Sequence, residues 1–307
     1  MLRTIFLLLF TMLVVPFVSF YFSPPLTGQQ WSLLKQGALI ALGIALACFI
    51  ISELSKNYSQ TDKVWSIAPI IYAWYFTAAA QWDDRMILMA VLVSIWGVRL
   101  SWNFNRRDGY SWRFWEGTED YRWYILRQKP FLQSDWNWRL FNFFFISLYQ
   151  NALIFLFTVP ILAVFTADSL PLNWLDGLLT FLFLFFVLFE TIADQQQWDF
   201  QTKKQILIQE NKNLEGDYAK GFLSSGLWGW SRHPNYFAEQ ALWVTFYVFS
   251  IVATSNWINW SMIGCLLLLL LFHNSAEFSE GVSASKYPKY SAYQKKVSRF
   301  LPFPRLK

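Results

Sequence analysis

The chain has 307 residues, of which 55% are hydrophobic and only 15% charged, with a formal net charge of +5. A soluble domain carries roughly a quarter charged residues. Apolar stretches near or above the roughly 18 residues that cross a bilayer recur along the whole sequence. This composition excludes an ordinary soluble protein, and no long polar block marks a separate soluble domain. We therefore expect residues 1–307 to form one integral membrane domain, an all-α polytopic transmembrane helical bundle.

The apolar stretches predict about eight membrane spans, with seven as the alternative. The first is interpreted as a retained span and not a signal peptide, because it is long and no small-residue cleavage site follows it. The expected spans are 4–23, 33–53, 64–81, 85–103, 141–166, 173–193, 236–254 and 257–274.

The polar connections between these spans form two unequal sets. Of the 25 Lys and Arg residues, 22 fall in one set, which comprises the N-terminus, 54–63, 104–140, 194–235 and 275–307. Basic residues stay on the cytoplasmic side of a membrane. We therefore expect both termini in the cytosol, in a bacterial inner membrane or the endoplasmic reticulum. Anionic lipid headgroups suffice as partners for this charge, and no nucleic acid is required.

Several familiar site chemistries are missing from the sequence. No Gly-rich phosphate loop, H-E-x-x-H or C-x-x-C motif occurs. Two histidines are too few for a histidine-rich metal site, so we expect no metal. Cys48 and Cys265 both lie inside apolar runs and indicate no disulfide framework.

The stretch "SRHPNYFAEQALW", residues 231–243, concentrates polar side chains at the start of an apolar segment. Pro234 suits the first turn of a helix. Asn235 and Glu239 then share one face of that helix, and Arg232 and His233 stand just before it, where an anion is favoured. Snorkelling at the membrane boundary would explain the positive charge. It would not explain Glu239, because a carboxylate inside a span is costly unless it is paired.

Other polar residues lie at or inside the expected spans. Glu190 and Asp194 are one turn apart at the end of the sixth span, where they are either functional or simply solvated. Arg99 lies inside an apolar stretch and needs an anionic partner, which Asp62 could supply. Tyr72 follows on the stripe that Asp62 begins, and its hydroxyl is a candidate proton donor.

The C-terminal segment "KYPKYSAYQKKVSRFLPFP", residues 286–304, interleaves tyrosines with lysines. An amphipathic basic and aromatic helix on the membrane surface would explain this pattern. Stacking rings beside cations would also hold a nucleotide, and Tyr290 and Tyr293 are the candidates for that contact.

Four of these stretches resemble one family. "GLWGWSRHPNYFAEQALW", "ADQQQWDF", "WGVRLSWNFNRR" with "EDYRW", and the C-terminal segment are similar to the steroid 5-alpha-reductase-like membrane proteins, especially their bacterial and plant branch. The matches occur in the same order over about 60–304. The resemblance implies a helical bundle with N-terminal spans in 1–103 and a cytosolic cofactor pocket in the C-terminal half, 104–307.

The resemblance also implies an activity, transfer of hydride from NADPH to a double bond of a lipid-like enone. The Glu and Tyr that steroid-reducing relatives carry in their N-terminal half have no secure match here, and Tyr72 is the expected catalytic residue. One alternative is an S-adenosylmethionine-dependent methyltransferase of the isoprenylcysteine carboxyl methyltransferase type, and another is a non-enzymatic lipid-binding protein. The partners expected are membrane lipids and a lipophilic small molecule. The expected cofactor-binding residues are Arg99, Asp194, Arg232, His233, Asn235, Tyr236, Glu239, Tyr290 and Tyr293.

Overall fold

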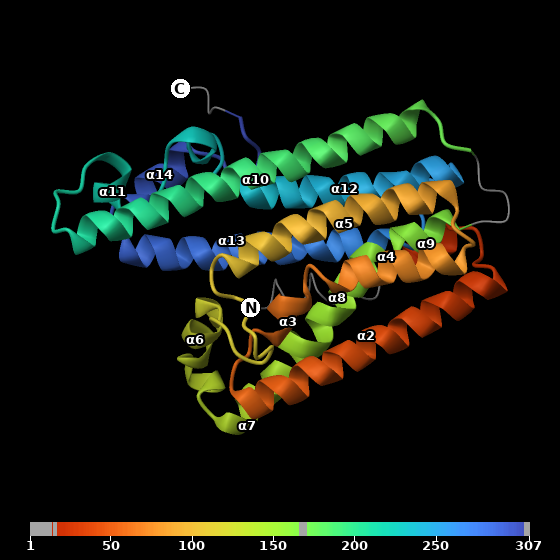
Figure 1. Ribbon diagram of the computed structural model, residues 1–307, viewed down its shortest axis with the longest axis horizontal. Coiled ribbons are helices and arrows are strands. Elements are labelled where there is room, and N and C mark those ends of the chain that lie inside the picture. The colour runs from red at the N-terminus through yellow and green to blue at the C-terminus, as the bar shows by residue number, and fades with distance from the viewer. Residues whose placement is uncertain (1–13, 15–16, 166–170, 304–307) are drawn as a thin grey trace. The chain divides into compact units, whose positions relative to one another are not determined.

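A computed structural model describes residue 14 and residues 17–165 and 171–303. Within these ranges the regular elements are helices, apart from one isolated bridge between Ser231 and Ser298 (Figure 1). This confirms the expected all-α membrane fold. Six helical segments of the described chain are long and apolar enough to cross a membrane: Gly28–Ser55, Asp84–Asn105, Asp135–Val164, Trp174–Gln209, Pro234–Thr254 and Met262–Lys286. The expected span at 4–23 lies mostly outside the described residues, and the parts of it that are described, residues 14 and 17–22, are helical.

The chain divides into two compact units, defined here as an N-terminal unit and a C-terminal unit. The N-terminal unit runs to Leu179 and adds Phe246–Leu267, and the C-terminal unit comprises Thr180–Thr245 and Leu268–Lys307. The chain therefore changes unit inside three of its helices, and the expected division into N-terminal spans in 1–103 and a cofactor-binding half in 104–307 stays a prediction.

The N-terminal unit contains ten complete helices among its described residues, and the C-terminal unit contains three short helices and the larger part of three long helices. The first set is α2 (Gly28–Ser55), α3 (Gln60–Val64), α4 (Ala68–Ala79), α5 (Asp84–Asn105), α6 (Tyr121–Arg127), η1 (Pro130–Leu132), α7 (Asp135–Phe141), η2 (Asn142–Tyr149), α8 (Gln150–Thr158) and α9 (Pro160–Val164). The helices shared by the two units are α10 (Trp174–Gln209), α12 (Pro234–Thr254) and α13 (Met262–Lys286). The short ones of the C-terminal unit are α11 (Gly216–Lys220), η3 (Gly226–Gly229) and α14 (Tyr290–Lys296).

The expected span at 64–81 is not one continuous helix. Helix α3 ends at Val64, a turn covers 65–67, and α4 has only 12 residues. Pro69 lies in the first turn of α4, where its missing N–H removes no helical hydrogen bond. At 1.5 Å per residue, 12 residues span about 18 Å, less than the roughly 30 Å of a bilayer core. The prediction of one continuous membrane-spanning helix at 64–81 was therefore wrong.

Two other helices continue well beyond their expected spans. Helix α10 extends from the predicted end at 193 to Gln209, and α13 extends from 274 to Lys286. The added residues include Gln, Lys, Glu, Leu and Ala, which favour helix without being apolar. Hydropathy locates the membrane-crossing part of such a helix but not its end. Helix α10 finishes where Asn211 takes a left-handed conformation, with φ of 51°.

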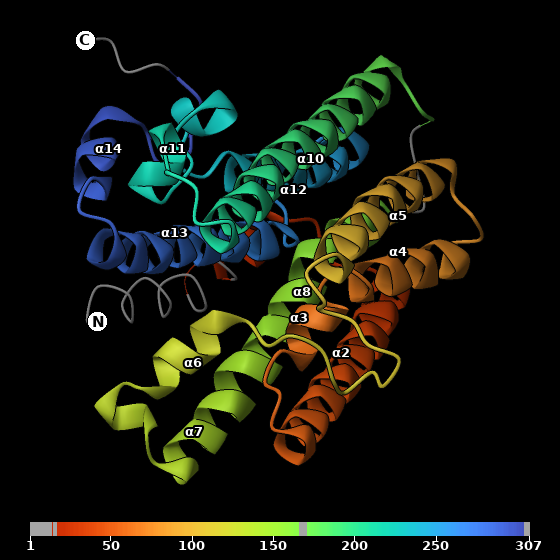
Figure 2. The ribbon, with the colours of Figure 1, turned by 60° about the vertical axis from the view of Figure 1, so that its left-hand side comes forward.

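The N-terminal unit is built around the run from α7 to α9. Helix α2 packs against η2 and α8, and α4 packs against both α5 and α8 (Figure 2). Helix α8 also meets the start of α13 closely, since a Cβ on Gly264 would lie 2.1 Å from the backbone of Leu156. Only glycine allows this approach.

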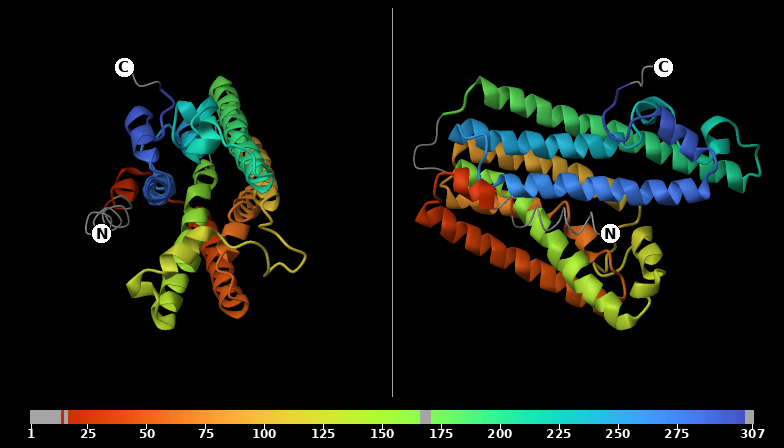
Figure 3. Two further views of the ribbon diagram at one scale, coloured as in Figure 1. Left: turned by 90° about the vertical axis from the view of Figure 1, so that its left-hand side faces the viewer. Right: turned by 180° about the vertical axis from the view of Figure 1, so that it is seen from behind.

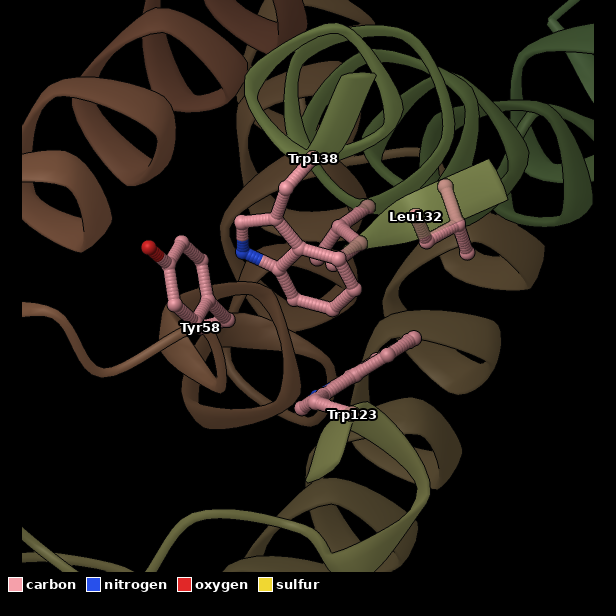
Figure 4. Close-up of a cluster of buried hydrophobic side chains, with 5 residues drawn as sticks. Tyr58, Trp123, Leu132 and Trp138 are labelled. Carbon is pink, nitrogen blue, oxygen red and sulfur yellow. The ribbon is translucent and has the colours of Figure 1, made fainter. Parts of the chain in front are cut away.

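An aromatic cluster fixes the short helices α6 and α7 at one end of the N-terminal unit. The ring of Tyr58 meets Trp138 edge to face at 5.0 Å, and Trp123, Leu132 and Ile146 complete the buried cluster (Figure 4). Asp62 Oδ2 accepts a hydrogen bond from Trp123 Nε1 at 3.1 Å. The segment 56–62 is thereby held against α6.

In the C-terminal unit, α10 and the unit's parts of α12 and α13 run side by side (Figure 3). Phe237 of α12 packs against Phe186 and Phe189 of α10, and Tyr236 packs against Phe272 of α13. Tyr236 and Phe237 are adjacent, so they leave α12 in different directions and reach different neighbours. The segment 231–239 therefore lies between two long helices.

Candidate functional site

The candidate site is centred on the segment that leads into α12. The backbone N–H groups of Arg232 and His233 donate to the carbonyls of Ser298 and Arg299 at 2.9 and 3.1 Å. Ser231 forms the isolated bridge with Ser298. The C-terminal segment after α14 is thus hydrogen-bonded to the residues that begin α12.

A buried carboxylate, that of Glu280 in α13, forms ion pairs and hydrogen bonds with the basic side chains of this segment. Arg232 contacts it through Nε at 2.7 Å and Nη2 at 3.2 Å, and His233 Nε2 lies 3.1 Å from Oε1. Gln294 and Arg299 approach Oε2 at 3.0 and 3.4 Å. Both side chains of the main pair are buried, with 8% of Arg232 and 3% of Glu280 exposed. Because breaking one partner of such a pair leaves an uncompensated buried charge, the cluster is a strong structural constraint.

The third nitrogen of the Arg232 guanidinium is also hydrogen-bonded. This nitrogen, Nη1, donates to the carbonyls of Gln294, at 2.8 Å, and Val297. The guanidinium therefore makes hydrogen bonds to α13, to α14 and to the residue after α14. In this structure Arg232 fastens the C-terminal segment to α12, and its predicted contact with a cofactor stays a prediction.

His233 is buried among rings and charges. Its ring stacks on Tyr236 at 5.2 Å and lies 6.2 Å from the ring of Phe300. Burial lowers the pKa of His233 below its ordinary value of 6.5, although the hydrogen bond to Glu280 opposes this. The imidazole is therefore neutral at pH 7, and its Nε2 donates a hydrogen bond to the Glu280 carboxylate without adding charge.

A second polar group lies where α10 and α12 face each other. Asn235 donates from Nδ2 to Asp194 Oδ1 at 3.0 Å, and Asp194 is only 4% exposed. One turn further along α12, Glu239 is also buried and accepts from Trp243 Nε1 at 3.0 Å. Asn235 and Glu239 lie on one face of α12, as the spacing predicted. The structure thus brings Asp194, Asn235 and Glu239 together.

The two candidate tyrosines of α14 lie on its buried side. Tyr290 and Tyr293 pack against Phe222 with ring centroids 5.0 and 5.2 Å away. Burial raises the pKa of Tyr290 to about 12, and it also raises the pKa of Tyr293. Tyr293 donates its hydroxyl hydrogen to the carbonyl of Trp228, in η3, the short helix within the loop before α12. Both rings are thus part of the packing that positions this loop.

An open groove of about 780 Å³ lies along the extended end of α10, between this helix and residues of the segment 215–226. Such a volume suits a drug-sized or nucleotide-sized ligand. The lining combines one lysine with three carboxylates and a stacked pair of rings, Phe200 and Tyr218. The charged and polar lining residues are Gln196, Asp199, Lys203, Glu215, Asp217 and Ser225.

Two predicted site residues belong to the other unit. Arg99 lies on α5 and is half-buried, and Tyr72 lies on α4 with no exposed surface. The Tyr72 ring packs edge to face on Phe155 at 5.3 Å. Its hydroxyl has no hydrogen-bond partner among the residues that the structure describes. Asp62, suggested above as an anion for Arg99, instead has the indole of Trp123 as a hydrogen-bond partner.

Sequence reasoning missed Glu280 and Lys203. Glu280 was placed in a polar connection, although "AEFSEG" continues the helical pattern of the last span. The helical spacing of Glu277 and Glu280 offered a signal, but only the fold shows which of the two is buried. Lys203 lies in the part of α10 that hydropathy did not predict, and no local pattern separates it from a solvated lysine.

Comparison with known proteins gives one family and one relative. Residues 48–297 match the family described as "Protein of unknown function (DUF1295)". A Schizosaccharomyces pombe protein, "Uncharacterized protein C594.04c", is 33% identical over 281 residues, which cover 88% of this chain and 79% of the relative. No solved structure matches the chain significantly. The family match covers most of the chain and includes α12 and its polar segment, so the chain belongs to the DUF1295 family.

Proposed function

We propose that the protein is a membrane-embedded reductase of the steroid 5-alpha-reductase-like type, which transfers hydride from NADPH to the double bond of a lipid-like enone. The proposal starts from the sequence resemblance described above. Two structural features support it, a buried tyrosine hydroxyl in the N-terminal unit and a buried group of hydrogen-bond acceptors in the C-terminal unit.

The observation that carries the proposal is the Tyr72 hydroxyl. It is fully buried, and no described residue accepts its hydrogen or donates to its oxygen. Leaving a buried polar group unpaired costs about 1–3 kcal/mol. The protein tolerates this cost if the Tyr72 hydroxyl donates its hydrogen to an oxygen of the bound substrate. In the proposed reaction, Tyr72 polarises the enone carbonyl and supplies the proton that complements hydride addition. A methyl transfer needs no such donor.

The residues of the C-terminal unit fit the polar parts of NADPH. Asp194 and Glu239 offer carboxylate oxygens to ribose hydroxyls or to the nicotinamide amide, and Asn235 holds Asp194 in place. Lys203 in the groove and the partly exposed Arg299 supply cations for phosphates. We assign Arg232 and His233 the role of shaping the start of α12. When bound there, NADPH would supply the hydride.

One observation favours the methyltransferase alternative. The groove has three carboxylates, Asp199, Glu215 and Asp217, against the single cation Lys203. Carboxylates bind ribose hydroxyls and a cationic sulfonium, and they repel phosphates. S-adenosylmethionine carries the sulfonium and no phosphate, so this groove suits it better than it suits the phosphates of NADPH.

Thermal melting of the detergent-solubilised protein distinguishes the two cofactors. A ligand at about 100 times its dissociation constant stabilises a protein by about 2.7 kcal/mol. We expect NADPH, and not S-adenosylmethionine, to raise the melting temperature. The opposite ranking would favour the methyltransferase, and no effect of either would favour a non-enzymatic lipid-binding protein.

Two variants separate cofactor binding from chemistry. Tyr72→Phe should keep the stabilisation by NADPH but lose oxidation of NADPH in the presence of a steroid enone as the probe. Glu239→Gln should weaken NADPH binding in calorimetry while the melting temperature without ligand changes little. If Tyr72→Phe retained full turnover of a competent substrate, the assigned proton donor would be refuted.

A further inference from the structure

The loop between α5 and α6 displays aromatic side chains on its outer surface. Trp112 is fully exposed, and Phe114 and Trp115 are 60% and 42% exposed. Phe114 and Trp115 contact each other edge to face at 4.9 Å. Two exposed arginines, Arg107 and Arg113, lie in the same loop. The loop extends outward from the helices around it (Figure 2).

The backbone of this loop is turned inward. Four consecutive carbonyls accept hydrogen bonds from side chains of the segment 57–63, which lies between α2 and α4. Lys63 donates to the carbonyls of Phe114 and Glu116, Gln60 to that of Trp115, and Asn57 to that of Gly117.

The segment 57–63 is the scaffold of the loop. Two of its donor residues are buried, since Gln60 is 5% and Lys63 6% exposed. The third donor hydrogen of the Lys63 ammonium reaches Gln60 Oε1 at 3.3 Å, so all three have acceptors. Gly117 closes the loop with φ of +116°, where a Cβ would lie 2.4 Å from the Gly109 carbonyl oxygen. The loop is therefore a fixed structure that presents its side chains, and not its backbone, to the outside.

The position of the loop in the chain places it at a membrane boundary. Its scaffold follows α2 directly, and the loop itself follows α5, and both helices are long and apolar enough to cross a membrane. The hydrogen bonds between scaffold and loop show that Ser55 and Asn105 end at the same face of the N-terminal unit. Tryptophan is enriched at such interfaces. Backbone carbonyls that face lipid without a partner are costly, and here four of them are satisfied internally.

We propose that residues 111–116 form a rigid aromatic anchor, which inserts Trp112, Phe114 and Trp115 into the headgroup region of the bilayer leaflet where α2 and α5 end. Arg107 and Arg113 bind anionic lipid headgroups beside it. The partner is the lipid surface itself. The anchor fixes the height of the N-terminal unit in the membrane, independently of any catalytic activity.

Spin labelling in nanodiscs that contain anionic phosphatidylserine tests this anchor. Both native cysteines are buried, and a background with Cys48→Ala and Cys265→Ala removes them. Ser111→Cys carries the nitroxide beside the three intact aromatic side chains, and Lys212→Cys, in the charged loop after α10, is the aqueous reference. Power saturation then compares collisions with oxygen, which concentrates in lipid, and with a water-soluble nickel complex. We expect the oxygen-to-nickel ratio at 111 to be several-fold higher than at 212.

Two further variants make the test specific. Replacing Trp112, Phe114 and Trp115 together with alanine keeps the carbonyls of the loop, and should lower the ratio at 111 to the aqueous value. Lys63→Met removes the scaffold and should make the nitroxide more mobile and lower the ratio. An aqueous ratio in the intact loop would overturn the proposal. Equal protection from both reagents would also overturn it, because the loop would then be covered by protein.

Discussion

At the scale of single residues, the ion pair of Glu280 and Arg232 holds the C-terminal segment against the start of α12. Arg232→Ala removes the main partner of a carboxylate that is 3% exposed. We expect the free energy of unfolding to fall by about 3–5 kcal/mol, the usual cost of breaking a buried pair from one side. Chemical denaturation of the solubilised protein measures this loss.

The double variant Arg232→Ala/Glu280→Ala is the matched control. It removes both charges, so its loss should be clearly smaller than the sum of the two single losses. Additive losses would show that the pair contributes no coupling. This experiment also separates the structural role of Arg232 from its predicted contact with a cofactor, because it needs no ligand.

The sequence predicted the polar segment itself but not this role. Pro234 and the four-residue spacing of Asn235 and Glu239 indicated a helix start with one polar face, and the structure has both. A guanidinium before a helix is typical of an anion site, which is why Arg232 suggested a phosphate. Its partner lies 48 residues away on another helix, and no local pattern encodes that distance.

His233 should make stability depend on pH. Burial lowers its pKa below 6.5 in the folded protein, with Glu280, Arg232 and Arg299 facing the ring. The unfolded state therefore takes up a proton first as the pH falls. Stability is full above about pH 6.5 and falls as the pH drops towards the folded-state pKa.

Melting temperatures measured from about pH 8 to about pH 5 test this dependence. We expect His233→Gln to flatten the part of the curve just below pH 6.5. His273→Gln, at the exposed second histidine, should leave that part unchanged. A wild-type curve that is already flat there would contradict the prediction.

At the scale of elements, a buried ion pair joins the start of α5 to the start of α10. Arg85 contacts Asp176 through Nε at 2.7 Å and Nη2 at 2.9 Å, with 1% and 3% of the side chains exposed. Asp176→Asn keeps the size of the side chain but removes its charge. The unfolding free energy should fall by about 3–5 kcal/mol, because Arg85 stays buried.

Asp135→Asn is the matched control, since Asp135 pairs with Arg127 at the surface, with 82% of its side chain exposed. Surface pairs contribute about 0–1 kcal/mol. Equal losses of unfolding free energy in Asp176→Asn and Asp135→Asn would mean that burial of the Arg85 pair does not increase its contribution to stability.

The elements themselves were predictable where an apolar run and a helix coincide. Residues 85–103 and 236–254 were predicted to within two residues of α5 and α12. The prediction was wrong for 64–81, where Pro69 and the turn before it divide the run. It was also too short for α10, because its last 16 residues are helical but polar. Hydropathy predicts which residues are buried in lipid. A helix can continue beyond those residues, because helix formation does not require apolar side chains.

At the scale of the whole molecule, the order of the chain did not predict the two units. Helices α12 and α13 each contribute to both units. No division of the sequence at a single residue can therefore reproduce these two units. The hydrogen bonds between 57–63 and 114–117 bring these two segments together at one face of the N-terminal unit, and the location of 54–63 and 104–140 on one side of the membrane stays a prediction.

The side of the membrane on which these segments lie is predicted from charge. With 22 of 25 Lys and Arg residues in one set of connections, we expect that set to face the cytosol.

Because Cys48 and Cys265 are buried, single cysteines at the exposed positions Gln128, Lys212 and Lys289 report on three connections separately. A membrane-impermeant maleimide should fail to label any of them in intact cells and should label all three after lysis. Tyr287, half-buried beside Lys289, provides the control that unfolding has not occurred, since Tyr287→Cys should label more slowly after lysis. Labelling of Gln128→Cys alone from outside would show that α4 and α5 do not both cross the membrane. Labelling of all three from outside would reverse the orientation.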